Sequence, residues 1–286
     1  MDNLLRTIQN QLNSFSKGQQ RIARYILESY EQAAFMTAAR LGETVGVSES
    51  TVVRFAYALG LEGYPALQDR LQELVLGHLT SVQRARLADR IPRDQVFSTV
   101  LNTDINAIRI TMDMADEGQF QQAVETIIKA RRVYVLGLRS AMPLAMFLAY
   151  YLEYICNSVI TFSANLQDVR EAMLRMDSRD AIICISFPRY SSRTAEAMAY
   201  ARQKGATTIA LTDKTDSPIG AMADVVLLAK SDMASFADSL TAPMSVINAL
   251  IVAAGLRSQK KVQEHLDELE KVWNREQVYF TEEDRV

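Results

Sequence analysis

The sequence predicts an α/β protein with an all-α N-terminal domain: a helix-turn-helix bundle followed by a five-stranded, parallel, doubly wound sheet of the flavodoxin-like kind. Two observations predict this class. The first 80 residues contain several helical periods and no convincing strand. Beyond Arg132, short apolar runs alternate with helical segments, and fully apolar short strands are typical of a parallel sheet that helices cover on both faces.

Composition bounds the class of protein further. The chain has 286 residues, of which 49% are hydrophobic, and a net charge of −3, which suits two modest domains. It opens without a basic segment that leads into an apolar core, and no stretch approaches the ~20 apolar residues that span a bilayer, so we expect a cytoplasmic protein. Cys156 and Cys184 fall in a predicted helix and a predicted buried strand with no C-x-x-C pattern, so we expect no disulfide, metal or other cofactor. The acidic pI of about 5.6 argues against a protein coated in basic charge for nucleic acid, but net charge does not exclude a local basic face.

The boundary between the domains is predicted at a polar, arginine-rich segment over residues 79–92, which Pro92 interrupts. We predict a helix-turn-helix DNA-binding domain over residues 1–80, a linker over 81–93, and an effector-binding and oligomerisation domain over 94–286. Ser16 is placed to cap an early helix over 16–29.

A helix-turn-helix pattern follows that early helix. Thr37 is placed to cap a helix that runs to Val45, and Gly46 is placed to end it in a left-handed turn. Ser48 is placed to cap a second helix, which Gly60 closes. Two helices joined by a three-residue turn that contains Gly form the helix-turn-helix pattern.

Five apolar runs predict the strands of the C-terminal domain: Val133–Leu136, Val159–Phe162, Ala181–Ile185, Thr207–Leu211 and Val225–Leu228. Helical segments at 94–112 and 120–129 precede the first run, and two long helical segments at 241–257 and 258–275 close the chain. With the strand order 2-1-3-4-5, the crevice where ligands bind lies between the first and third strands.

The second helix of the helix-turn-helix pattern is the candidate DNA-reading element, because such a helix lies in the major groove with its N-terminal residues at base edges and phosphates. Hydroxyls and helix amides suit phosphate oxygens, and an arginine one turn on reaches phosphate or guanine. Glu49 suits either a contact to cytosine or a capping or solvated acid, and a capped helix pair with no DNA partner remains the alternative. The predicted DNA-binding residues are Ser48, Glu49, Ser50, Thr51 and Arg54.

Two strand exits meet at the predicted crevice: GLRSA over 137–141 and SFPRYSSRT over 186–194. The other exits, SANLQD after Phe162 and TDKTDS after Leu211, are typical of ordinary helix caps. Hydroxyls and the amides of a helix N-terminus form a cradle for an oxyanion, and arginines add bidentate donors. The alternative is that the hydroxyls only cap helices and the arginines pair with acids across a dimer. The predicted effector-binding residues are Gly137, Arg139, Ser140, Ser186, Arg189, Ser191, Ser192 and Thr194.

These motifs carry a family resemblance. The stretch ARLGETVGVSESTVVRFAYALGLEGYPALQ resembles the helix-turn-helix of the RpiR-type (MurR/RpiR) bacterial transcription regulators, and the rest resembles their phosphosugar-binding sugar isomerase (SIS) domain. The resemblance implies a one-component repressor or activator, a homodimer or homotetramer, whose affinity for a double-stranded DNA operator responds to a small phosphorylated metabolite. It matches Ser140 to the family's first phosphate-binding serine, Ser186 and Ser191 to those of the second loop, and Thr194 to the threonine at the next helix start.

The two loops also depart from the family pattern. Arg139 stands where the family has a second glycine, Ser192 stands where glycine is expected, and residues 188–190 look inserted. Arg139 and Arg189 together suit a ligand that bears a carboxylate or more than one anionic group. Arg193, just inside the following helix, is compatible with a position that faces solvent.

Two other functions compete with the regulator. A phosphosugar isomerase needs an acid and a base near the sugar, and Glu153 is the carboxylate to consider, since His78 lies near the linker and His265 in a charged terminal helix. A stand-alone isomerase has no use for a helix-turn-helix, so we expect no enzyme. The third function is a protein-binding module that uses the helical domain to oligomerise. For the regulator, subunit contacts are expected on the helix over 94–112 and on the charged closing helix.

Overall fold

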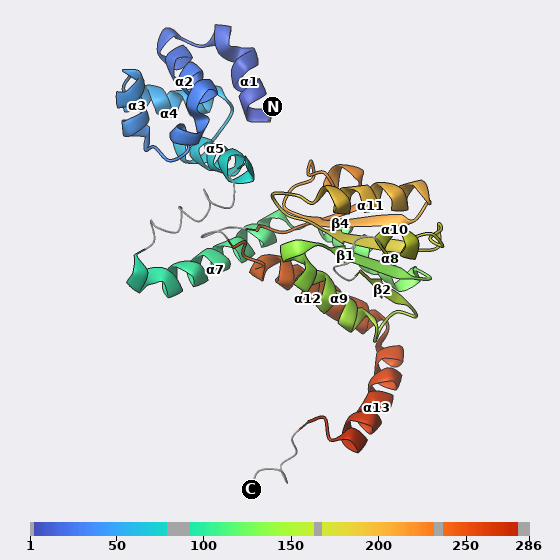
Figure 1. Cartoon of the computed structure of the whole chain (residues 1–286). Coiled ribbons are helices and arrows are strands. Elements are labelled where there is room, and N and C mark those ends of the chain that lie inside the picture. Colours follow the sequence, from blue (N-terminus) through green and yellow to red (C-terminus); the bar gives the residue numbers. More distant parts are fainter. Residues whose placement is uncertain (1–2, 79–91, 163–167, 232–236, 280–286) are drawn as a thin grey trace. The chain divides into compact units, whose positions relative to one another are not determined.

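The computed structural model describes residues 3–78, 92–162, 168–231 and 237–279. The chain divides into two compact units, Met1–Arg86 and Leu87–Val286, and each is described by itself (Figure 1). The finer division into 1–80, 81–93 and 94–286 stays a prediction, because most of the predicted linker lies outside the described residues.

The N-terminal unit is helical throughout its described part. Each of its five helices buries at least one large apolar side chain, and the rings of Phe15 and Phe55 meet edge to face with their centroids 5.1 Å apart. The helices are α1 (Asn3–Gln11), α2 (Lys17–Ala33), α3 (Ala38–Val45), α4 (Glu49–Ala58) and α5 (Tyr64–His78), with a 3-10 turn η1 (Leu12–Ser14).

Local signals fix the ends of these helices as the sequence predicts. The Ser16 side chain accepts a hydrogen bond from the backbone of Gln19, whose own side chain accepts one from the Ser16 backbone, so α2 begins with a capping box. The Thr37 hydroxyl accepts from the backbone N–H of Arg40 and caps α3. Gly46 ends α3 at a φ of 69°, the left-handed region that favours glycine.

The C-terminal unit is an α/β fold with one five-stranded sheet in the order β2-β1-β3-β4-β5, and every neighbouring pair is parallel. The predicted fold class and strand order are therefore confirmed. The strands are β1 (Val133–Gly137), β2 (Val159–Thr161), β3 (Ala181–Ile185), β4 (Thr207–Thr212) and β5 (Val225–Leu228). The helices are α7 (Val96–Met114), α8 (Glu117–Lys129), α9 (Met142–Leu152), α10 (Asp168–Ala172), α11 (Ser192–Gln203), α12 (Thr241–Arg257) and α13 (Gln259–Glu276), with the 3-10 turns η2 (Arg93–Gln95), η3 (Arg139–Ala141) and η4 (Gly220–Met222).

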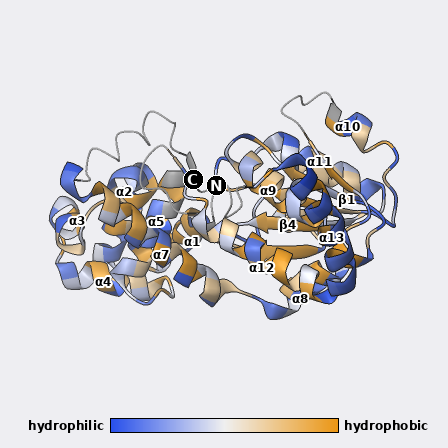
Figure 2. Ribbon diagram, turned by 90° about the horizontal axis from the view of Figure 1, so that it is seen from below, coloured by the Kyte–Doolittle hydropathy of each residue, from blue (hydrophilic) through white to orange (hydrophobic). Residues whose placement is uncertain are grey.

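Helices cover both faces of the sheet. Alternate strand residues pack either with α8, α9 and α12 or with α10 and α11, so each face has its own buried cluster. Figure 2 shows the strands as hydrophobic and α13 as largely hydrophilic. This two-faced burial is the physical reason that the strand sequences are apolar without alternation.

One crossover differs from the sequence prediction. The chain from β4 to β5 contains only the short turn η4 and no α-helix, so the expectation that TDKTDS caps a helix is wrong. Two buried hydroxyls of this segment instead bond within it: those of Thr212 and Ser217 lie 3.0 Å apart, and the Ser217 hydroxyl accepts from the backbone N–H of Gly220. The exit SANLQD lies mostly outside the described residues.

The two cysteines are buried or half-buried, and burial raises the pKa of Cys156 to about 11 and also raises the pKa of Cys184. No single helix among the described residues is long and apolar enough to cross a membrane; only α12 and α13 taken together have that length and composition, and the chain bends by 99° between them.

Candidate functional site

The exits of β1 and β3 lie side by side at one edge of the sheet. Gly137, the last residue of β1, pairs in register with Ile185, the last residue of β3. Each exit leads into a helix, α9 after the first and α11 after the second. The predicted switch point is therefore formed as the strand order requires.

Close main-chain packing shapes the first exit. A Cβ atom on Gly137 would lie 2.5 Å from the carbonyl oxygen of Ala141, so only glycine fits there. Arg139 follows with a φ of 57°, a left-handed conformation that strains a residue other than glycine. The exposed Ser140 donates a long hydrogen bond of 3.4 Å to Oδ2 of Asp238.

Side-chain hydrogen bonds shape the second exit. The buried Ser186 hydroxyl accepts from the backbone N–H of Ser191 at 3.2 Å, and the Ser191 hydroxyl accepts from the backbone N–H of Thr194 at 3.3 Å. Ser191 is thus the N-cap of α11, as one alternative for these hydroxyls expects. Thr194 is fully buried, and its hydroxyl has no hydrogen-bond partner in the part of the chain that the structure describes.

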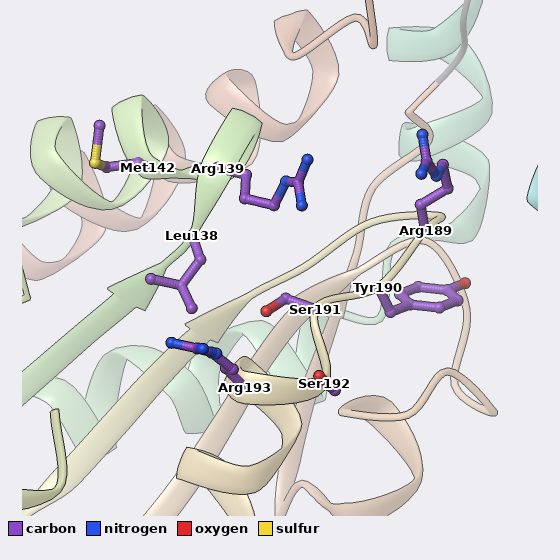
Figure 3. Close-up of a pocket in the computed structure, with 8 residues that line it drawn as sticks. All are labelled: Leu138, Arg139, Met142, Arg189, Tyr190, Ser191, Ser192 and Arg193. Atoms are coloured by element: carbon purple, nitrogen blue, oxygen red, sulfur yellow. The ribbon is translucent and has the colours of Figure 1, made fainter. Parts of the chain in front are cut away.

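A pocket of about 570 Å³ lies between the two exits (Figure 3). Four of the predicted effector residues line it: Arg139, Arg189, Ser191 and Ser192. The other four do not line it: Gly137 and Ser186 support the loops, Ser140 contacts Asp238, and Thr194 lies within the first turn of α11.

Four further lining residues were missed by sequence reasoning: Leu138, Met142, Tyr190 and Arg193. Arg193 is exposed, which is compatible with the sequence interpretation, but it also lines the pocket. Its place in the first turn of α11, directly after the hydroxyl loop, was the signal that could have found it.

The lining of the pocket is strongly cationic. Three arginines and no carboxylate line it, and Arg139 and Arg193 form no ion pair with any described residue. In Figure 3 the Ser191 hydroxyl lies between the guanidinium groups of Arg139 and Arg193, whereas Arg189 points away from it. Such an arrangement favours an anion over a neutral ligand.

The predicted DNA-binding residues form the N-terminal face of α4. Ser48, Glu49, Ser50 and Arg54 are exposed and Thr51 is half-buried. Ser48 occupies the N-cap position, but the expectation that its hydroxyl caps the helix is wrong, because that hydroxyl lies 2.9 Å from the hydroxyls of both Ser50 and Thr51.

Arg54 and one residue that sequence reasoning missed extend this face along α4. The Arg54 side chain donates from Nε to the carbonyl oxygen of Ser50 at 3.2 Å. Tyr57, one turn further on, is 60% exposed. Residues three and four apart share a helix face, so Ser50, Arg54 and Tyr57 present one mixed polar and aromatic surface.

Comparison with known proteins decides the family. Residues 2–75 match the helix-turn-helix domain of the rpiR family, and residues 126–253 match the SIS domain. The chain is a member of the RpiR-type transcriptional regulators. The HTH-type transcriptional regulator HexR of Pseudomonas aeruginosa is 26% identical over 270 residues, which cover 93% of this chain and 94% of HexR. YbbH of Bacillus subtilis, another HTH-type regulator, is 27% identical over 226 residues, which cover 78% of each chain.

Solved structures share the fold. The sugar isomerase domain of an RpiR transcription factor from Sphaerobacter thermophilus is 27% identical with a TM-score of 0.59, and the match covers 62% of this chain and 99% of that domain. The Vibrio vulnificus NanR protein, solved in complex with ManNAc-6P, is 20% identical with a TM-score of 0.59, and the match covers 96% of this chain and 98% of NanR.

Proposed function

We propose that this transcriptional regulator binds a double-stranded DNA operator in the cytoplasm and that a small anionic metabolite, a phosphosugar or a sugar acid, controls its operator affinity from the pocket between the exits of β1 and β3. The observation that carries the proposal is that Arg139 and Arg193 lie on two sides of the Ser191 hydroxyl in one pocket, which Arg189 also lines and no carboxylate lines. Positive charges gathered around one pocket repel one another and attract an anion, so the lining favours a negatively charged ligand.

Three further features of the second exit support an oxyanion. The 12-residue helix α11 directs its N-terminus toward this edge, and helix N-termini attract anions through their unpaired amides. The Ser191 and Ser192 hydroxyls line the same wall. The buried Thr194 hydroxyl in the first turn of α11 lacks a partner among the described residues, so it is available as a further hydrogen-bond donor.

The number of arginines bears on the class of metabolite. One phosphate is satisfied by a helix N-terminus with hydroxyls, whereas planar guanidinium groups suit a second anionic group such as a carboxylate. ManNAc-6P is the ligand in the NanR structure. Because this chain resembles NanR in fold alone, the ligand class proposed here rests on the residues of this chain.

A thermal-shift experiment on the full chain tests the effector proposal. The probes are inorganic phosphate, glucose 6-phosphate, gluconate and 6-phosphogluconate, with uncharged glucose as the control. A ligand at a concentration of 100 times its Kd stabilises the native state by about 2.7 kcal/mol, so the melting temperature should rise with the anions and not with glucose. A melting temperature that no anion raises, or that glucose raises equally, would contradict the proposal.

The proposed DNA contacts lie at the leading end of α4. Ser48, Ser50 and Thr51 are proposed to contact phosphates, and Arg54 a base or a phosphate; Glu49 is proposed to face the groove beside them. Arg54→Ala should weaken operator binding by about 1–3 kcal/mol if Arg54 reads a base, and should weaken binding to all sequences alike if it contacts phosphate. A mobility-shift assay measures this, with Arg6→Ala on α1 as the matched control.

A protein-binding module would behave differently in that assay. Its helical unit would show no DNA complex at any salt concentration, and Arg54→Ala would be indistinguishable from the unmodified protein. Loss of binding at high salt, by contrast, is expected of any protein that neutralises phosphates.

A homodimer or homotetramer is proposed because two half-sites require two reading helices at a fixed spacing. Helix α7 supports this, since it exposes six large apolar side chains, with Phe97 79% exposed: Val96, Phe97, Val100, Leu101, Ile105 and Met112. The effector would act by favouring one arrangement of the subunits over another. Phe97→Ser with Leu101→Ser should lower the mass measured by light scattering, and the exposed pair Val252 and Leu256 of α12, changed alike, is the comparison.

A non-enzymatic role is proposed over phosphosugar isomerisation. Glu153 follows the last residue of α9, so it lies at the opposite end of that helix from the pocket, about 16 Å away along the axis. The His265 ring lies against Tyr154, with the ring centroids 5.3 Å apart, and does not line the pocket. Turnover of aldose or ketose phosphates that Glu153→Gln abolishes would overturn this.

A further inference from the structure

The second exit is tied to the exit of β4 at both of its ends. The backbone N–H of Ser186 donates to the carbonyl oxygen of Leu211 at 3.2 Å. The Tyr190 hydroxyl donates to Oδ1 of Asp213, the residue directly after β4, at 2.7 Å. Residues 187–189 therefore form a short arch between two attachments to the neighbouring strand.

A strained residue lies within this arch. Arg189 has a φ of 66°, and a left-handed conformation costs a residue with a Cβ about 1 kcal/mol or more. Such a residue persists only where its surroundings hold it. Phe187 is buried in the core on one side of it, and the Tyr190–Asp213 hydrogen bond lies on the other.

Asp213 is itself held firmly. The Thr212 hydroxyl lies 3.3 Å from the same carboxylate oxygen that Tyr190 contacts, and Thr212 and Ser217 are fully buried beneath it. Burial raises the pKa of Asp213, while the hydrogen bond from Tyr190 acts in the opposite direction. The carboxylate does not line the pocket, so it does not repel an anion there at short range.

We propose that Tyr190 and Asp213 are positioning residues that form a latch: their hydrogen bond sets the conformation of residues 186–191 and so presents the anion-binding groups at the start of α11. The proposal rests on the proposed function of the pocket. Ser191, the neighbour of Tyr190, links the latch to the pocket. The backbone N–H of Ser191 donates to the Ser186 hydroxyl, and the Ser191 hydroxyl accepts from the N–H of Thr194. The Tyr190 ring lines the pocket, but its hydroxyl is directed to Asp213.

The latch has a test that needs no ligand. Hydrogen–deuterium exchange of the full chain is followed in the peptide that spans residues 186–193. Tyr190→Phe and Asp213→Ala should each raise the exchange rate of that peptide about tenfold, and the double variant should raise it no further, because both changes remove the same bond. Asp213→Asn keeps an acceptor oxygen and should retain most of the protection. Tyr200→Phe, on α11 and outside the loop, is the matched control.

Binding is measured on the same variants with inorganic phosphate and glucose 6-phosphate as probes. Each single variant should weaken the affinity about five- to tenfold, the double variant should be no weaker than either, and Asp213→Asn should recover much of the affinity. Full affinity in Tyr190→Phe would overturn the latch, as would unchanged exchange in Tyr190→Phe and Asp213→Ala.

One pattern separates a latch from a ligand contact. Lost affinity with unchanged exchange would mean that Tyr190 contacts the ligand directly, which overturns a positioning role. Raised exchange in both variants of a protein that binds none of the probes would support the latch and count against the proposed effector function instead.

Discussion

The two strand exits that border the pocket are held in place by different interactions. The first is held by its main chain: Gly137 packs against the carbonyl of Ala141, and its polar side chains are left to solvent or to the pocket. The second is held by side chains, through the hydroxyls of Ser186 and Ser191 and through Tyr190. The first exit should therefore be sensitive to a single methyl group on its glycine, and the second to the loss of single hydroxyls.

The largest effect is expected from Gly137→Ala. The added Cβ would lie 2.5 Å from the Ala141 oxygen and 3.1 Å from the Ala145 Cβ, so backbone must move, at a cost of about 2–3 kcal/mol in the free energy of unfolding. Chemical denaturation measures this. Gly255→Ala, within α12 where the nearest atom is 3.9 Å away, is the matched control and should be neutral or stabilising by up to about 1 kcal/mol.

Equal stability of Gly137→Ala and Gly255→Ala would contradict this difference between the two exits. It would mean that the β1 exit relaxes freely, and that main-chain packing does not shape the first loop. Gly137 does not line the pocket, so Gly137→Ala should reduce anion affinity only if the altered loop moves Arg139. Binding and stability are therefore measured on the same sample.

The next effect is expected from Arg139→Gly, which acts on affinity and stability in opposite directions. Removal of one of three guanidinium groups should weaken binding of 6-phosphogluconate about tenfold, while relief of the left-handed φ should leave stability unchanged or raise it by up to about 1 kcal/mol. Gln277→Gly, at the left-handed end of α13, is the control for backbone relief without a change in binding. Unchanged affinity in Arg139→Gly would remove the case for a second anionic group.

The structure of the first exit could be predicted from the sequence better than that of the second. Strand positions, strand order and the glycine exit follow from local patterns and from the rules for parallel sheets, and the structure confirms the fold class they predict. The bond between Tyr190 and Asp213 joins residues 23 apart, and sequence reasoning took the TDKTDS exit for a helix cap because nothing local marks its true partner. Arg193 lines the pocket because α11 begins at Ser192 after its N-cap Ser191, and the sequence, with hydroxyls at 191, 192 and 194, does not single out which of them is the cap.

A smaller and more diagnostic effect is expected from Thr194→Val. The Thr194 hydroxyl is buried without a partner among the described residues, and an unmet buried hydroxyl costs about 1 kcal/mol or more, so valine should stabilise the free protein by about that amount. If the hydroxyl donates to the anion, affinity should fall several-fold at the same time. Thr208→Val is the matched control, because the equally buried Thr208 hydroxyl is bonded to Asp224 at 2.8 Å, and its loss should destabilise by about 1–3 kcal/mol.

The smallest effect on stability is expected from Ser140→Ala, set against Ser191→Ala. Ser140 is exposed and its hydrogen bond to Asp238 is long, so the free energy of unfolding should change by less than about 0.5 kcal/mol. Ser191 caps α11, so its loss should cost about 1 kcal/mol. Ser191→Ala should also lower anion affinity, because the Ser191 hydroxyl lines the pocket, whereas Ser140 does not line it. Denaturation curves that shift equally for the two variants would show that side chains hold both exits alike, since only a hydroxyl that supports its loop in the free protein contributes to stability before the anion binds.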